Sequence, residues 1–314
     1  MNNPYKYSLD NKRYQTYNYY LKQRFGQKVY RISIDAGAGC PNRCGEKAVG
    51  GCAFCSAGSL PLGRFNGISR NELFKRMEAG RQAVGAKCAN GPFIAYFQSG
   101  SNTYGDTEAF RLAFESALCF ENVVGLCIAT RADCIDEKCA DMLACLAEKT
   151  YLTVELGLQT VHDKTARFCN RAHSYEDFLR GVKLLSERSI GIGVHLINGL
   201  PSETHEMMVE SARVISHLPI HCVKIHMLFI ERGTPIAKMY LNGKFELLSR
   251  EEYVSIVCDQ LELLPENVII ARLTGDSDRK NLIAPEWSLK KLCVLNEIDK
   301  ELTRRNSWQG IYHK

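Results

Sequence analysis

The sequence predicts an α/β fold in which parallel strands alternate with helices. From residue 29 onward, short runs of β-branched and apolar residues alternate with longer stretches of helical periodicity, which is typical of βα units around a parallel sheet. Polar and glycine-rich segments follow the apolar runs, as expected if ligands bind at the carboxyl ends of the strands. An open doubly wound sheet and a barrel share these features, and periodicity alone does not separate them.

Six apolar runs are the predicted strands: Val29–Ile34, Phe93–Phe97, Val123–Ala129, Leu152–Leu156, Ile190–Leu196 and Val223–Leu228. Between them lie five predicted helices: Arg70–Val84, Thr107–Leu118, Asp136–Ala147, Tyr175–Glu187 and Glu203–His217. Asp106 and Ser174 are suitable N-cap residues for two of these helices, because their side chains can accept hydrogen bonds from the first free backbone N–H groups.

Three segments are expected along the chain. Residues 1–28 form a basic and aromatic N-terminal extension, residues 29–235 form the core, and residues 236–314 form a C-terminal extension in which the regular alternation fades. The extension is predicted to contain a helix near Arg250–Leu264, a short strand at Val268–Ile270 and a final helix near Leu289–Arg305. We expect it to pack on the core as an appendage.

Composition excludes several classes of protein. No apolar run approaches the roughly 18 residues that a membrane helix needs. The segment Met1–Asp10 lacks the apolar core of a signal peptide, so a cytoplasmic protein without a membrane partner is expected. The 14 cysteines are spread through strand and helix patterns, unlike the framework of a small disulfide-rich protein, so most are expected to be free thiols in a reducing compartment.

The charge of the chain permits a polyanionic partner. Lysine and arginine exceed aspartate and glutamate by 40 − 35 = 5. Basic residues and tyrosines are interleaved in residues 5–31, and basic residues recur near the C-terminus. Such runs are commonly solvated surfaces, and the alternative is a nucleic-acid interface, because phosphates attract cations and unpaired bases stack on aromatic rings.

The loop after the first predicted strand contains Cys40, Cys44, Cys52 and Cys55. A Cys-x3-Cys-x2-Cys pattern beginning at Cys40 fails, because Lys47 occupies the third position. Cys40-x11-Cys52-x2-Cys55 provides three thiolates, enough to hold a [4Fe–4S] cluster with one iron open to a ligand. Alternatively, all four thiolates could hold a structural zinc ion.

Several motifs make the chain resemble the radical S-adenosylmethionine superfamily. They include Cys40-Pro-Asn-Arg, Gly50-Gly-Cys52-x-x-Cys55, Ala95-Tyr-Phe-Gln98 with Asn102-Thr-Tyr104, Val154-Glu-Leu-Gly-Leu-Gln-Thr160, Gly199-Leu-Pro201 and Arg272-Leu-Thr-Gly-Asp276. The resemblance extends over nearly the whole chain and is strongest to a bacterial branch with a Cys-x11-Cys-x2-Cys triad, related to the radical domain of the Elongator catalytic subunit. Cys44 stands where this branch usually has aspartate, which leaves the role of Cys44 open.

The resemblance implies both a fold and a chemistry. The expected fold is a partial (β/α)6 TIM-like barrel with a small C-terminal α/β extension. Cys40, Cys52 and Cys55 would hold a [4Fe–4S] cluster, and S-adenosylmethionine bound at its open iron would be cleaved reductively to a 5′-deoxyadenosyl radical. Such an enzyme also needs a reductant such as flavodoxin or ferredoxin. The type of reaction, oxidoreductase or transferase, is left undetermined, and no catalytic residue is assigned.

Five residues are expected to contact S-adenosylmethionine. Gln98 and Asn102 occupy the place of the Gly-Gly-Glu segment that receives the methionyl amine in most relatives, although the glutamate is missing here. Glu155 and Gln159 match a Glu-Leu-Gly-x-Gln motif whose glutamine lies by the ribose. Arg171 matches an arginine that grips the methionyl carboxylate, a role that suits the fork of guanidinium donors.

Other residues near the predicted rim can be core or site residues. A buried carboxylate such as Glu155 costs several kcal/mol unless it is paired, which argues against a packing role alone. His195 and His226 lie on strands directed toward the rim, where a core histidine and a substrate contact are equally good interpretations. Arg131, at the end of the third predicted strand, can reach substrate or cofactor.

The resemblance to the Elongator subunit suggests transfer RNA as the substrate and its wobble uridine as the modified nucleoside. This inference is by analogy, because a fold alone does not define a function. One alternative keeps the radical chemistry but directs it to a small metabolite or a peptide. Another is a non-catalytic RNA-binding protein stabilised by zinc on the four loop cysteines.

Overall fold

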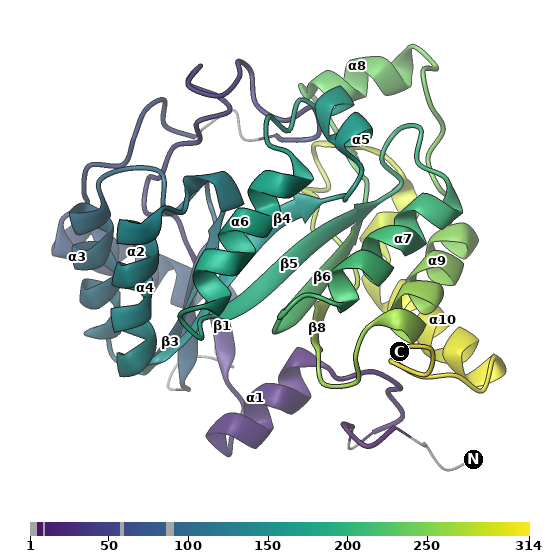
Figure 1. Cartoon of the computed structure of the whole chain (residues 1–314), viewed down its shortest axis with the longest axis horizontal. Coiled ribbons are helices and arrows are strands. Elements are labelled where there is room, and N and C mark those ends of the chain that lie inside the picture. Colours follow the sequence, from purple (N-terminus) through teal and green to yellow (C-terminus); the bar gives the residue numbers. More distant parts are fainter. Residues whose placement is uncertain (1–4, 9, 57–59, 86–90) are drawn as a thin grey trace.

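A computed structural model describes residues 5–8, 10–56, 60–85 and 91–314. Its centre is a curved parallel sheet of seven strands in the order β1-β2-β3-β4-β5-β6-β8 (Figure 1). The strands are β1 (Tyr30–Ile34), β2 (Phe93–Phe97), β3 (Val123–Thr130), β4 (Tyr151–Gln159), β5 (Gly191–Asn198), β6 (Cys222–Met227) and β8 (Ile269–Arg272). Because β1 and β8 are edge strands that do not pair with each other, the sheet forms a half-barrel with one open side. The predicted α/β partial-barrel fold is confirmed.

Most helices lie on the outer face of this sheet (Figure 1). The helices are α1 (Tyr17–Phe25), α2 (Arg70–Val84), α3 (Thr107–Leu118), α4 (Glu137–Lys149), α5 (Asp163–Phe168), α6 (Tyr175–Ser186), α7 (His205–Ser216), α8 (Pro235–Leu241), α9 (Arg250–Leu263) and α10 (Lys291–Arg304). The predicted N-caps are confirmed: Asp106 accepts hydrogen bonds from the first turn of α3, and Ser174 forms a capping box with Asp177 at the start of α6. No helix in the described segments is long and apolar enough to cross a membrane.

The C-terminal part of the chain contributes a strand to the sheet. The strand predicted at 268–270 is β8, and it pairs in parallel with β6, with Cys222 opposite Ile269. β8 thereby covers the backbone groups that β6 would otherwise leave unpaired at the edge. A separate antiparallel pair, β7 (Ile230–Glu231) with β9 (Leu282–Ala284), lies outside the main sheet.

The two faces of the sheet carry different side chains. Successive residues of a strand point to opposite faces, so Val154 and Leu156 of β4 pack in the main core while Glu155 lies on the inner, concave face. On β6 the same alternation places Lys224 on the concave face between the core residues Val223 and Ile225. The interior of the half-barrel is therefore polar, although its strands are mostly apolar.

The N-terminal segment packs against the C-terminal part of the chain. The Tyr5 hydroxyl donates to the Glu266 carbonyl at 2.7 Å, and Thr16 forms a parallel bridge with Ile270 of β8. Tyr5 and Tyr14 are each only 4% exposed. These two tyrosines are core residues and cannot stack on bases, in contrast to the nucleic-acid interpretation of this segment.

Candidate functional site

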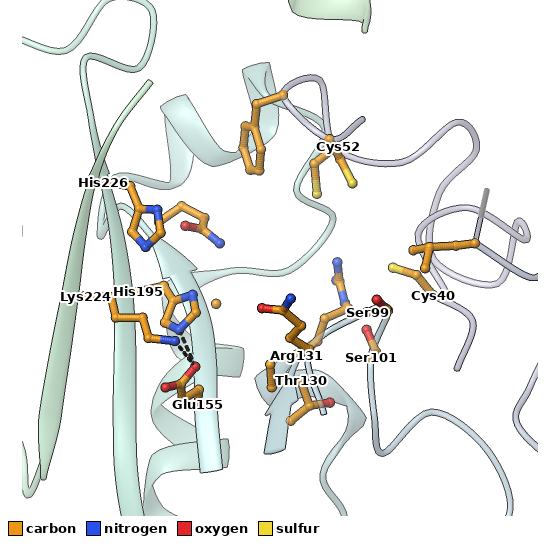
Figure 2. Close-up of a pocket in the computed structure, with 18 of the residues that line it drawn as sticks. Cys40, Cys52, Ser99, Ser101, Thr130, Arg131, Glu155, His195, Lys224 and His226 are labelled. Atoms are coloured by element: carbon orange, nitrogen blue, oxygen red, sulfur yellow. Dashed lines mark hydrogen bonds and ion pairs between the residues drawn. The ribbon is translucent and has the colours of Figure 1, made fainter. Parts of the chain in front are cut away.

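A cavity of about 560 Å³ opens at the carboxyl ends of the strands. Its upper wall carries thiols, its sides carry arginine and amide groups, and its floor carries a cluster of charged residues (Figure 2). The lining includes Cys40, Cys52, Cys55, Gln98, Arg131, Glu155, Gln159, Arg171, His195, Lys224, His226 and Arg272. Side chains from the cysteine loop and from most of the strands thus face one space.

The cysteine loop lies between β1 and α2 and is fastened to the loop that follows β2. The Ser101 N–H donates to the Gly39 carbonyl at 2.9 Å. Gly100 has a φ of 72°, and a Cβ at this position would collide with the Ala38 carbonyl. The close approach of the two loops therefore requires glycine at position 100, and it helps to hold Cys40 at the rim of the cavity.

Three of the four loop cysteines line the cavity, as the Cys40-x11-Cys52-x2-Cys55 pattern requires. Figure 2 shows the sulfur atoms of Cys40 and Cys52 directed into the same space. Cys44 does not line it, and its Sγ lies 2.8 Å from the Tyr104 hydroxyl. A four-cysteine zinc site needs Cys44 beside the other three thiols, so this placement argues against such a site.

The donor set suits a cluster with three protein ligands. Each cysteine of such a triad ligates a different iron, so the three sulfur atoms surround a space and do not meet at a point. In the described part of the chain, no three His, Cys, Asp or Glu side chains converge as the ligands of one ion. Cys52 also receives N–H groups from Asn42 at 3.3 Å and from Arg171 at 3.7 Å, contacts that fix the position of its sulfur.

Arg171 is held beside Cys52 by an unusual backbone. It lies between α5 and α6, and its neighbours Asn170 and Ala172 both have positive φ, 51° and 56°. Arg131 donates to the Arg171 carbonyl at 3.0 Å, while Arg131 itself is held by Asp133. Left-handed conformations at two non-glycine residues cost energy, and they persist here because surrounding contacts fix the loop.

The Arg171 guanidinium is buried with donors to spare. Its Nη2 donates to the Gly157 carbonyl, while its Nε is buried without a hydrogen-bond partner. Burial lowers the pKa of Arg171, the nearby Cys52 opposes that change, and the Arg131 cation lowers the pKa further. The positive charge of Arg171 is buried beside that of Arg131 and is only partly balanced by nearby groups. An anionic ligand would stabilise the Arg171 cation.

A bulge at the end of β4 shapes the same wall. The pairing of β4 with β5 shifts between Gly157 and Gln159, and Gln159 has a φ of 76°. A Cβ on Gly157 would lie 2.9 Å from Gln159 Nε2 and 3.0 Å from Arg171 Nη2. The missing side chain at Gly157 leaves room for both groups to reach the cavity.

The floor of the cavity is a buried ion cluster. Glu155 accepts hydrogen bonds from His195 Nε2 at 2.9 Å, from Arg31 Nη1 at 3.1 Å and from Lys224, as Figure 2 shows for His195 and Lys224. Burial alone raises the pKa of Glu155, but Lys224, His195 and Arg31 outweigh that effect and hold the pKa well below its usual range. Glu155 is therefore ionised at neutral pH.

The two histidines of the floor are neutral at the same pH. Burial lowers the pKa of His195, and it lowers the pKa of His226 well below the usual range. The rings lie 5.8 Å apart and are stacked, and His226 Nε2 is buried without a hydrogen-bond partner. His226 is thus a neutral group with an unused nitrogen at the cavity.

The structure brings together four of the five residues predicted to contact S-adenosylmethionine: Gln98, Glu155, Gln159 and Arg171 line the cavity. Asn102 lies beneath the cavity wall, where its Nδ2 donates to the carbonyls of Phe97, Ser99 and Ala129. Lys224 also lines the cavity, although its position in the sequence did not predict a role for it. A lysine within the apolar strand 223–228 is as conspicuous as Glu155, and the same argument from the cost of burial would have found it.

Comparison with known proteins agrees with this geometry. The profile described as the radical SAM superfamily matches residues 36–215, and that of the radical SAM C-terminal domain matches residues 220–304. The chain is 46% identical over 311 residues to the YtqA protein of Bacillus subtilis, covering 99% of this chain and 96% of that protein.

Two further similarities are to an archaeal tRNA acetyltransferase and to the solved structure of an archaeal Elp3. The chain is 30% identical over 156 residues to the tRNA uridine(34) acetyltransferase of Methanocaldococcus jannaschii, covering 49% of this chain and 28% of that protein. The solved structure of Elp3 from Methanocaldococcus infernus superimposes with a TM-score of 0.63 at 18% identity, covering 90% of this chain and 64% of that chain. The structural match confirms the fold alone, and the profile match over residues 36–215 shows that the chain belongs to the radical SAM superfamily.

Proposed function

We propose that this protein is a radical S-adenosylmethionine enzyme whose [4Fe–4S] cluster is held by Cys40, Cys52 and Cys55. The observation that carries the proposal is that these three thiols and the poorly compensated Arg171 line one cavity at the carboxyl end of the sheet. Thiolates supply ligands for the irons, and the guanidinium supplies donors for a carboxylate beside them.

The protein residues would have separate tasks. When bound, the cluster supplies the electron that cleaves S-adenosylmethionine to methionine and a 5′-deoxyadenosyl radical. Arg171 holds the methionyl carboxylate, and Arg131 keeps the loop of Arg171 in place. Gln159 and Gln98 offer amide groups to the remaining polar atoms of the ligand, and Phe54, which also lines the cavity, limits the access of water to the cluster.

Substituting Arg171→Lys tests the carboxylate contact. Lysine keeps the charge but loses the planar fork of donors, so the affinity for S-adenosylmethionine is expected to fall about tenfold or more. Equilibrium dialysis of the reconstituted enzyme measures this change. Arg167→Lys, on the neighbouring helix α5 and away from the lining of the cavity, is the matched control and should bind normally. Equal affinity in Arg171→Lys and wild type would refute the contact.

The proposed substrate is transfer RNA, modified at the wobble uridine. Support comes from the 30% identity to a tRNA uridine(34) acetyltransferase and from the net charge of +5. Mass spectrometry of nucleosides from transfer RNA of cells with and without the gene tests this proposal. Loss of one modified uridine in the deleted strain, restored by the wild-type gene but not by a Cys52→Ala copy, is expected. An unchanged nucleoside profile would refute the transfer RNA proposal.

A second candidate retains the radical chemistry but acts on a small metabolite or peptide. The observation that favours it is the burial of Tyr5 and Tyr14, which removes two aromatic rings from the surface expected to contact RNA. Salt-sensitive binding of bulk transfer RNA to the reconstituted enzyme would count against this candidate, whereas an absence of binding at low salt would favour it.

A further inference from the structure

A second cavity, of about 520 Å³, lies on the open side of the half-barrel between β1 and β8. One wall is formed by Arg31 and Ser33 of β1 and another by residues 270–274, at and just after β8. The N-terminal segment from Lys12 to Asn18 and helix α1 close it below, where Figure 1 places α1 beneath the strands. The proposed function leaves this space without a role.

The second cavity adjoins the first. Tyr96, Gln98 and Arg272 line both cavities, so these three residues form the boundary between the site of S-adenosylmethionine and the open side. A molecule in the second cavity would therefore present its near end to the space beside the cofactor. The volume is ample for a group of the size of a nucleotide or an amino acid.

Two arginines face this space from opposite edges of the sheet. The Arg31 guanidinium lies between two aromatic rings, 5.2 Å from the Tyr17 centroid and 4.6 Å from the Tyr96 centroid, and it contacts Glu155. Arg272 pairs with Asp276 through Nη1 at 2.8 Å, which engages one of the five N–H groups of a guanidinium. Donors remain for a ligand at the boundary of the two cavities.

Positive charge exceeds negative charge where the cavities meet. The cations that line the cavities there are Arg31, Lys224 and Arg272, and the carboxylates are Glu155 and Asp35, a difference of 3 − 2 = 1. Asp276, which pairs with Arg272, also pairs with the Lys291 cation, so it does not reverse this excess. Burial lowers the pKa of Arg272, and Arg31 lowers it further, because the two cations repel each other.

The remainder of the lining is mostly apolar or aromatic. Tyr14, Tyr17, Leu21, Val29, Leu273 and Leu295 surround the space below the arginines. Such a lining suits a planar or hydrocarbon group, whereas the arginines suit a carboxylate or phosphate, whose geometry matches the guanidinium fork.

We propose that the second cavity is the substrate chamber and that Arg272, together with Arg31, binds an anionic group of the substrate, a phosphate or a carboxylate. The reacting carbon then lies toward the boundary formed by Tyr96 and Gln98, next to the cofactor. This inference rests on the proposed function, because it assigns the substrate chamber of the same enzyme.

The test measures anion binding directly, with the reconstituted enzyme saturated with S-adenosylmethionine so that the first cavity is filled. Inorganic phosphate and acetate are added separately at constant ionic strength made up with chloride, and the thermal midpoint gives an apparent Kd for each anion. At least one anion is expected to stabilise the wild-type enzyme. Binding of phosphate alone would indicate that the substrate carries a phosphate, and binding of acetate alone would indicate a carboxylate. Binding of both would support an anion site that accepts either group.

Variants locate the site. Arg272→Gln is expected to weaken anion binding about tenfold or more, because a charged donor is lost, and Arg272→Lys is expected to restore part of the affinity. Ser33→Asp, at an exposed position of β1, places a carboxylate in the chamber and should also weaken binding; it serves as the test if Arg272→Gln does not fold. Arg304→Gln removes an exposed cation of α10 outside the chamber and should bind like the wild type.

Two results would overturn the proposal: no stabilisation of the wild type by either anion, or equal affinities in wild type and in folded Arg272→Gln and Ser33→Asp variants. The measurement requires neither turnover nor transfer RNA. Failure of the chamber therefore differs from failure of the proposed function, which shows as an absence of S-adenosylmethionine cleavage or as an unchanged nucleoside profile.

Discussion

Cys52→Ala is expected to abolish the iron–sulfur cluster, whereas Cys44→Ala should retain it. Cys52 is buried at the cavity and receives hydrogen bonds from Asn42 and Arg171, while Cys44 contacts Tyr104 outside the cavity. After anaerobic reconstitution, wild type and Cys44→Ala should contain about four irons per chain and absorb in the visible range, and Cys52→Ala should lose most of both.

Comparing the two variants distinguishes a cluster with three cysteine ligands from a zinc site with four. Each removes one thiol from the same loop, so a general effect of losing a cysteine would appear in both. Equal loss of iron in Cys44→Ala and Cys52→Ala would contradict the assignment of three ligands. Zinc with four thiolate ligands in the native protein would contradict it as well.

Glu155→Leu is expected to destabilise the protein by about 3–5 kcal/mol, since it leaves the buried cation of Lys224 without its partner. The Lys224 side chain is 3% exposed and that of Glu155 is 1% exposed, so water cannot replace the lost contact. Lys224→Met should cost less, because Arg31 and His195 still contact Glu155. Urea unfolding of the three proteins measures the differences in the free energy of unfolding.

The double variant Glu155→Leu/Lys224→Met is the control for this ion pair. Removing both charges avoids the isolated buried cation, so the double variant should be more stable than Glu155→Leu alone. If the two single effects simply add, Glu155 and Lys224 are not coupled. Because the folded pKa of Glu155 lies below its unfolded value, its contribution is present above the usual glutamate pKa and is lost as the pH falls toward the folded pKa.

Local sequence patterns predicted most strands and helices of the half-barrel, but they did not predict the pairing of β8 or the presence of helix α1. The apolar runs and their intervening helices identified the strands that became β1 to β6, because each strand is apolar over its own length. The strand β8 was predicted, but its partner was not, since a pattern of four residues carries no information about which sheet it joins. Helix α1 was missed because its run of tyrosines and basic residues lacks a clear apolar stripe.

In the candidate site, too, the sequence predicted residues that lie close together in the chain but not the contacts between distant residues. The spacing Cys40-x11-Cys52-x2-Cys55 suggested those three cysteines as ligands, because they lie near one another in a single loop, but that loop also contains Cys44. The orientation of Cys44 depends on Tyr104, which is 60 residues away, and the role of Arg31 depends on Glu155, which is 124 residues away. Contacts of this range are set by the packing of strands and loops, so single-sequence patterns do not reveal them.

The most direct test of the account is the reductive cleavage of S-adenosylmethionine by the anaerobically reconstituted protein. With dithionite as the electron donor, the wild type is expected to form 5′-deoxyadenosine and methionine, and the Cys52→Ala variant is expected to form neither above background. Absence of dithionite-dependent cleavage in the cluster-loaded wild type, or its persistence in Cys52→Ala, would contradict the assignment of this protein as a radical S-adenosylmethionine enzyme with a cluster on Cys40, Cys52 and Cys55.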